Sequence, residues 1–256
     1  MATLVDTRVL SHAARSIAAV AEKDIPVRAT GVRAPWGDEP GDKDSIALIV
    51  SAPGLTATAR VPLEGGTLDD DIELGLDGIK KLGAAAEEIV KFVKAKHKED
   101  KVEEDGAEND YLATIEFDDR DNRIYIYPTI PATSGTIIGY RILDDESKVD
   151  KGHVNTILNT KGRTKVVDEH GNELTSGALI LLNPSVLDKL VKVSKVQSRA
   201  SIQFYVNEHK AGQMRASIGN DDEVAGTALV SMVVFPEKWS EDKDTSDPDN
   251  VVDFGA

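Results

Sequence analysis

Hydrophobic and polar positions follow the helical period in three long segments of the chain and the strand period around them. In the segment 184–199, Lys189, Lys192, Lys195 and Arg199 lie on one arc of a helical wheel. The opposite arc is apolar and consists of Val186, Leu187, Leu190, Val191, Val193 and Ser194. A period of about 3.6 residues predicts a helix that packs its apolar face on the core and keeps its cations in water.

Two earlier segments separate apolar and basic positions in the same way. The segment 7–23 has on its polar arc Arg8, His12, Arg15 and Lys23. The segment 77–98 has on the arc opposite its apolar residues Lys80, Lys91, Lys94 and Lys98. We therefore expect three amphipathic helices, each with a basic outer face.

Short runs rich in β-branched residues, or with alternating polarity, surround these helices and predict strands. The runs are 1–5, 25–32, 45–51, 56–63, 71–74, 111–117, 123–127, 136–143, 179–182, 201–207, 213–218 and 228–235. The order β-α-β-β-β thus occurs twice in the first 143 residues and once more at the end. The stretch between 136 and 174 is too short for another full unit, although Val154, Ile157 and Leu158 have helical spacing.

This order predicts an α+β fold of repeated β-α-β-β-β units. We expect an N-terminal domain over 1–143 and a C-terminal domain over 144–236. The segment 237–256 is acidic and rich in Ser, Pro and Asp, so we expect it to be a disordered tail.

The charge of the chain is unevenly distributed between these elements. The sequence has 30 Lys and Arg residues against 45 Asp and Glu residues, which gives a formal net charge of −15. The three predicted helices hold 13 basic and 5 acidic residues, a net charge of +8, so the remainder carries −23. Helix propensity alone would favour Glu as much as Lys. The asymmetry therefore favours a function in which the helices form one polyanion-binding surface.

Signatures of catalysis and of metal or cofactor binding are absent from the sequence. There is no cysteine, which excludes disulfides and thiolate metal sites, and no phosphate-binding loop, zinc-protease or nucleophile-elbow motif. The acidic runs 69–71 and 118–121 fall where turns are expected. We expect no enzymatic activity, no cofactor and no metal. Since no signal peptide or membrane span is evident, we also expect a cytoplasmic protein with no membrane partner.

The last unit carries a resemblance to a known family. Its sequence ALILLNPSVLDKLVKV, followed by alternating strands and ALVSMVVFP, resembles the last repeat of bacterial β clamps. The repeated units with basic helices on an acidic chain are similar to the DNA polymerase sliding clamps in general. Length and acidity are similar to those of the proliferating cell nuclear antigen and of two-domain phage clamps.

This resemblance implies a ring of six domains, hence a homotrimer, with helices inside and antiparallel sheets outside. Such a ring would encircle duplex DNA without regard to sequence and tether a DNA polymerase, after a clamp loader had placed it. A phage-encoded clamp would act in the host cytoplasm. The ring requires pairing edges between subunits, which we expect near 111–127 and 201–218.

Two sets of residues follow from this hypothesis. The DNA-binding set consists of Arg8, Arg15, Lys80, Lys91, Lys94, Lys98, Lys189, Lys192, Lys195 and Arg199. The pocket for a partner's peptide, which the resemblance places at the end of the final strand, consists of Met232, Val233, Val234, Phe235 and Pro236, with Phe235 as its anchor.

Two alternatives remain open at this point. One is an open or monomeric processivity subunit that holds DNA by charge alone. The other is an acidic structural or assembly protein whose lysine-rich helices pack against a protein partner.

Overall fold

The computed structural model describes most of the first 143 residues and the main elements of the C-terminal part. The described residues are 2–33, 43–102, 108–118, 120–129, 136–143, 149–150, 154, 183–196, 202–206, 214–218 and 230–234. The expected strand 179–182, most of 147–174 and the tail 237–256 lie outside this part. So do Arg199, Phe235 and Pro236.

Two β-α-β-β-β units occupy the first 143 residues, as the hydrophobic pattern predicts. The first consists of β1 (Ala2–Asp6), α1 (Thr7–Val20), β2 (Val27–Val32), β3 (Ser45–Ala52) and β4 (Leu55–Gly66). The second consists of β5 (Ile72–Leu74), α2 (Leu76–Asp100), the 3-10 turn η1 (Glu108–Tyr111), β6 (Leu112–Asp118), β7 (Arg123–Pro128) and β8 (Thr136–Gly139), followed by β9 (Arg141–Ile142). After them come α4 (Pro184–Val196), β10 (Ile202–Val206), β11 (Met214–Ile218) and β12 (Val230–Val234). The predicted α+β class is confirmed.

The strands form one antiparallel sheet in which the two units exchange strands. The main order is β8-β7-β6-β1-β4-β3-β2-β5-β9. The first strand of each unit therefore pairs with the other unit, β1 with β6 and β5 with β2. This exchange makes the two units a single structural body.

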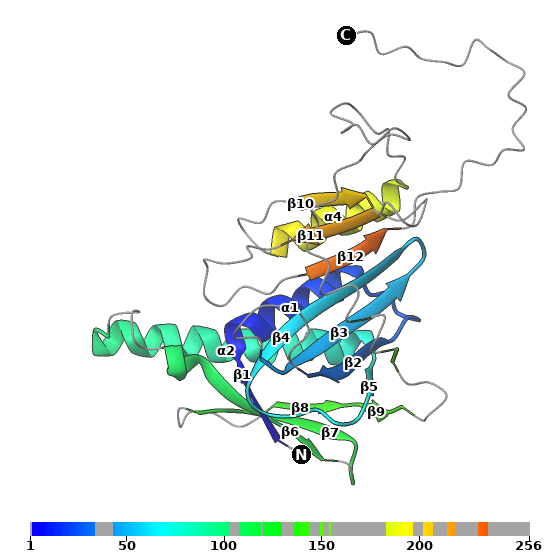
Figure 1. Ribbon diagram of the computed structural model, residues 1–256. Helices are drawn as coiled ribbons and strands as arrows, with labels where there is room; N and C mark the ends of the chain where they lie inside the picture. Colours follow the sequence, from blue (N-terminus) through cyan, green and yellow to red (C-terminus); the bar gives the residue numbers. More distant parts are fainter. Residues whose placement is uncertain are drawn as a thin grey trace, which may run out of the picture.

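Strand β4 connects the C-terminal strands to this sheet. One edge pairs with β3 along Leu55–Pro62. The other edge of β4 pairs with β12 near the start of β4 and with β1 near the end of β4. In Figure 1, the group of β10, β11 and β12 continues the sheet above β4. A glycine is needed at position 66, where the end of β4 lies close to β1. The φ of Gly66 is +78°, and a Cβ there would lie 2.3 Å from the carbonyl oxygen of Ala2.

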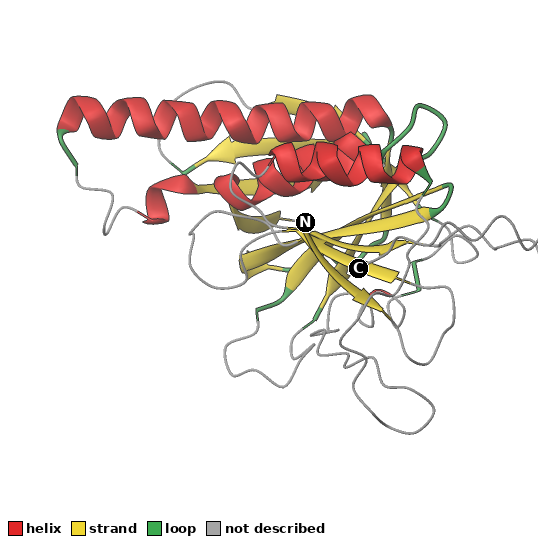
Figure 2. Ribbon diagram, turned by 90° about the horizontal axis from the view of Figure 1, so that it is seen from above, coloured by secondary structure: helices red, strands yellow, loops and turns green. Residues whose placement is uncertain are grey.

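The three helices lie in one layer on one face of the sheet (Figure 2). Helix α1 is the middle helix and packs on both α2 and α4. Its position explains its composition, because only Arg15 of its residues is exposed and small residues such as Ala13, Ala14 and Ser16 are buried. Side chains from this layer and from the facing side of the sheet form the main core, among them Leu10, Ile17, Leu48, Leu55, Leu74, Ile79, Leu190 and Met232.

Two expectations about local structure are wrong. The expected strand 136–143 is broken at Tyr140, whose ring is buried edge-on against Phe117 with the ring centroids 6.0 Å apart. Strand β8 then pairs with β7, whereas β9 pairs with β5. The expected subunit edge at 111–127 is also misplaced, because β6 and β7 are each paired on both sides. Among the described strands, β8, β9 and β10 each have a single partner.

The apolar arc predicted for the last helix is only half buried. Val186, Leu190 and Val193 are buried, but Leu187 is 46% exposed and Val191 is 38% exposed. These two residues lie on the flank of α4 opposite Lys189, which faces the end of α1. Because α1 covers one flank and the sheet covers the base, the other flank has no packing partner within the described part.

Candidate nucleic-acid interface

Helix α2 supplies the longest row of cations on the helix layer. Lys80, Lys91 and Lys98 are spaced so that they share one stripe of the helix surface, and Lys94 lies beside them. All four side chains are exposed. Lys80, Lys94 and Lys98 have no ion-pair partner among the described residues, so their ammonium groups are available to a polyanion.

The centre of the layer is a charge cluster shared by α1 and α2. Arg15 Nη1 lies 3.3 Å from Glu87 Oε2, and Lys91 Nζ lies 2.9 Å from Glu87 Oε1. The hydrogen bond from Lys91, then the charges of Arg15 and Lys91, lower the pKa of Glu87. Exposed pairs of this kind contribute about 0–1 kcal/mol, so an approaching phosphate can take over these cations at little cost.

His12 lies within the same cluster and is half-buried. Its burial, together with the positive charges of Arg15 and Lys94, lowers its pKa below the usual 6.5, and the negative charges of Asp6 and Glu87 act in the opposite direction. Within the described part its Nδ1 is buried without a hydrogen-bond partner. The imidazole is therefore neutral at pH 7, and a phosphate nearby would favour its protonation.

Arg8 is placed differently from the other predicted DNA-binding cations. Its Nη2 lies 2.6 Å from Asp6 Oδ2, its Nε donates to the same carboxylate at 3.1 Å, and its guanidinium lies 4.3 Å from the ring centroid of Tyr111. Its side chain is only 19% exposed. Arg8 thus connects the start of α1 to Tyr111 of η1. Helical spacing alone does not reveal this contact.

The cations of α4 have three different environments. Lys189 is 13% exposed and its Nζ lies 2.5 Å from Glu22 Oε1, just beyond α1, so it connects two helices. Lys192 is exposed and pairs with Asp188 one turn earlier at 2.6 Å. Lys195 is exposed and has no ion-pair partner among the described residues. The structure therefore brings Lys192 and Lys195, rather than Lys189, to the surface.

The predicted peptide pocket is only partly described. Met232 is fully buried and belongs to the core. Val233 and Val234 pair through β12 with Thr56 and Leu55 of β4. A depression of about 310 Å³ is lined by residues that include Thr56, Ile25, Pro26, Ile49, Val149 and Val154. The depression therefore adjoins the strand end to which the sequence assigns the pocket.

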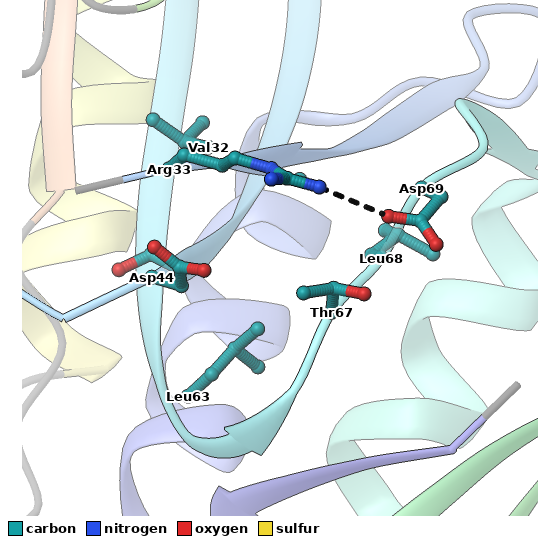
Figure 3. Close-up of a pocket in the computed structure, with 9 residues that line it drawn as sticks. Val32, Arg33, Asp44, Leu63, Thr67, Leu68 and Asp69 are labelled. Atoms are coloured by element: carbon teal, nitrogen blue, oxygen red, sulfur yellow. Dashed lines mark ion pairs between the residues drawn. The ribbon is translucent and has the colours of Figure 1, made fainter.

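A second depression lies at the other end of the same strands (Figure 3). It has a volume of about 510 Å³ and is lined by residues that include Val32, Ser45, Leu63 and Leu68. Arg33 and Asp69 face each other across its rim at 3.7 Å, and both side chains are exposed. The pair is solvated, so this depression has no buried charge to select a ligand.

Asp71 has a role that the sequence does not reveal. It closes the acidic run 69–71, where a turn is expected, yet it is buried. Thr30 Oγ1 donates to its Oδ1 at 2.6 Å, and the backbone N–H of Val149 donates to its Oδ2 at 2.8 Å. Asp71 thus fixes the segment after β9 on the sheet. Within the described part, no group of three or more acidic or histidine side chains could hold a metal.

The chain is similar to several solved protein structures. No protein-family model matches the chain, and no curated protein matches its sequence. The DNA polymerase III β subunit from Thermotoga maritima is 11% identical, with a TM-score of 0.49, over 92% of this chain and 64% of that chain. The β subunit from Pseudomonas aeruginosa is 10% identical, with a TM-score of 0.46, over 93% of this chain and 65% of that one.

A third similar structure comes from a virus. PF-8, the DNA polymerase accessory subunit from Kaposi's sarcoma-associated herpesvirus, is 11% identical, with a TM-score of 0.43, over 92% of this chain and 98% of that one. The chain thus spans slightly less than two thirds of the bacterial subunits that it matches.

Proposed function

We propose that the chain is a sliding clamp, a ring-shaped factor that encircles duplex DNA and tethers a DNA polymerase. The observation that carries the proposal is the helix layer. On one face of a continuous antiparallel sheet, helices α2 and α4 expose lysines and α1 exposes Arg15, while the chain as a whole carries −15. An acidic chain with one basic face attracts the phosphate backbone at that face and repels it elsewhere.

The proposed contacts are to phosphate and not to bases. Long flexible lysines dominate the exposed cations of the described helices. Phosphate contacts of this kind position a protein on DNA without selecting a sequence. They give binding that weakens with salt, with a log–log slope of about 0.9 for each phosphate neutralised. Weak and salt-sensitive contacts suit a ring that slides.

The ring would be a homotrimer closed through sheet edges. Strands β8, β9 and β10 are the edges that the described part offers, and an unpaired strand edge is a ready site for pairing with another chain. A trimer has three times the monomer mass of 27.6 kDa. Native mass spectrometry distinguishes this state from an open or monomeric processivity subunit, and a monomer that still binds DNA would favour that alternative.

The polymerase and the clamp loader would dock by apolar peptides at the depression beside the end of β12. Its walls combine Ile25 and Ile49 with Val149 of the segment that Asp71 holds. Phe235, which lies outside the described residues, would be the anchor contact for such a peptide. Such a replication factor would act in the cytoplasm, the host's if phage-encoded. None of the helices within the described ranges is long and apolar enough to cross a membrane.

Topological retention tests the function directly. The protein, loaded onto a nicked circular plasmid, should survive a high-salt wash and be released when a restriction enzyme linearises the plasmid. Reversal of Lys80, Lys94 and Lys98 to Glu should prevent this retention. The matched control reverses three exposed cations outside the helices, Arg33, Arg120 and Arg141, with the same change in net charge. Equal loss in both triple variants would refute the assignment of the helix layer as the DNA-facing surface.

A further inference from the structure

The β6–β7 hairpin carries two parallel tyrosines on the face of the sheet opposite its buried side. Along β7, Ile124 and Ile126 are buried, whereas Tyr125 and Tyr127 alternate with them on the other face. The two phenol rings are parallel to within 7° and their centroids are 6.1 Å apart. Tyr127 is 40% exposed, so part of its ring is accessible to a ligand.

An unpaired carboxylate lies beside these rings. Glu116 of β6 is directly opposite Tyr125 in the strand register, and its side chain is exposed. Among the described residues, Glu116 has no ion-pair or hydrogen-bond partner. Partial desolvation, followed by the charge of Glu116, raises the pKa of Tyr127.

Among the paired residues of this hairpin, the other neighbours on this face add a single cation, Arg123. Thr114 is opposite Tyr127, and Asp118 is opposite Arg123. Arg123 itself pairs with Asp121, with its Nη1 3.8 Å from Oδ2. The aromatic faces and the free carboxylate therefore form a site that attracts positive charge.

We propose that Glu116, Tyr125 and Tyr127 form a docking site for an arginine side chain on an extended segment of a partner protein. A guanidinium is planar, so it can stack on a phenol ring while its N–H groups donate to a carboxylate. Lysine would satisfy the charge but not the stacking. Because these residues are on the face away from the helix layer, the site is independent of DNA binding and of the clamp function.

Single-stranded nucleic acid is the competing occupant, since bases also stack on exposed tyrosines. Its phosphates would meet the carboxylates of Glu116, Asp118 and Asp121, against one cation, Arg123, among the paired residues of this hairpin. Charge complementarity therefore favours the arginine segment.

The test uses the full chain with 13C-labelled tyrosine, observed by NMR. The probe is a blocked (Ser-Arg)4 peptide, compared with its (Ser-citrulline)4 and (Ser-Lys)4 counterparts and with oligothymidylate. The arginine peptide should shift the Tyr125 and Tyr127 signals saturably, and the citrulline peptide should not. Glu116→Gln and Tyr127→Leu should each weaken its binding about tenfold, which corresponds to about 1.4 kcal/mol.

A matched variant separates this site from the general attraction of an acidic protein. Glu88→Gln removes one exposed, unpaired charge from the helix layer and should leave the affinity for the peptide unchanged. Equal weakening by Glu88→Gln and Glu116→Gln would overturn the proposal. So would equal binding of the arginine and lysine peptides, or tyrosine shifts produced by oligothymidylate at lower concentration than by the arginine peptide.

Discussion

Lys189 of α4 and Glu22 beyond the end of α1 form an ion pair across two helices that are far apart in the sequence. The distance from Nζ to Oε1 is 2.5 Å, and the two residues are 167 positions apart. Among the described cations expected to bind DNA, Lys189 is the least exposed, whereas Lys192 and Lys195 are exposed on the same helix. Neighbouring lysines of one amphipathic helix thus have separate roles, one in holding α4 on α1 and the others at the surface.

Replacement of Lys189 should therefore affect stability more than DNA binding. Lys189→Met keeps the aliphatic part of the side chain and removes the ion pair, so we expect a loss of about 1 kcal/mol in the free energy of unfolding. Urea denaturation measures this loss. Lys195→Met is the control and should leave the unfolding midpoint unchanged while it reduces the salt dependence of DNA binding. A reversed result would show that Lys189 faces the DNA.

The contact between α1 and α2 depends on a glycine. Ser11 Oγ donates to the carbonyl oxygen of Gly83 at 3.4 Å. A Cβ at position 83 would lie 3.0 Å from Arg15 Cγ and 3.4 Å from Ala14 Cβ. Gly83→Ala should be close to neutral, because the gain in helix propensity of about 1 kcal/mol offsets a contact that the flexible Arg15 can relieve.

A larger side chain at the same position should separate the helices. Gly83→Leu should lower the free energy of unfolding by about 2 kcal/mol, since overpacking forces α2 away from α1. Thermal unfolding of the two variants measures the difference. If Gly83→Leu were as stable as Gly83→Ala, the helices would not be in close contact at this point.

The depressed pKa of His12 predicts a loss of stability in acid. The unfolded chain takes up a proton at the ordinary value of 6.5, whereas the folded protein resists until a lower pH. The contribution of His12 to the free energy of unfolding is therefore fully present above pH 6.5. It is lost as the pH falls through the pKa of His12 in the folded protein. His12→Gln should flatten this part of the pH profile of the unfolding midpoint. Glu87, whose pKa is also lowered, loses its contribution at still lower pH.

Duplex DNA on the helix layer should raise the pKa of His12. A phosphate near Arg15 and Lys94 would cancel their repulsion of the imidazolium, so protonation and DNA binding should favour each other. An NMR titration of His12 with and without a duplex measures the shift. Unchanged titration with DNA bound would place the phosphates elsewhere.

The buried carboxylate of Asp71 should be essential for the segment after β9. Asp71→Ala leaves the N–H of Val149 and the hydroxyl of Thr30 without their acceptor. We expect a loss of about 2–3 kcal/mol in the free energy of unfolding, the cost of unsatisfied buried groups. Thr30→Val is the control and should cost less, because it leaves the bond to Val149 intact. Hydrogen exchange at Val149 should accelerate only in Asp71→Ala.

The sequence predicts the helices and strands well, because each depends on a local period. Helix α4 begins at Pro184 and the strands of the β6–β7 hairpin match their predicted runs within a residue. The break at Tyr140 was not predictable in the same way, because it depends on which strands pair with β8 and β9. The prediction that Leu187 and Val191 are buried is wrong for a similar reason, since periodicity does not say how many flanks of a helix are covered.

The candidate site is predictable as a pattern of charge but not as a set of contacts. The spacing of Lys80, Lys91 and Lys98 was sufficient to place them on one stripe. The contact of Arg8 with Tyr111, and of Lys189 with Glu22, joins residues distant in sequence, and nothing in the local pattern marks them. The domain boundary at 143 and the peptide pocket at 232–236 stay predictions.

The exchange of first strands between the two units has a consequence for synthesis of the chain. Strand β1 leaves the ribosome well before its partner β6, which follows only after both α1 and α2 have emerged. Thr7 at the start of α1 likewise donates to the carbonyl oxygen of Tyr111, 104 positions later. The nascent N-terminal strand therefore has to remain unpaired on one edge during translation, and the first unit cannot mature before the second is made.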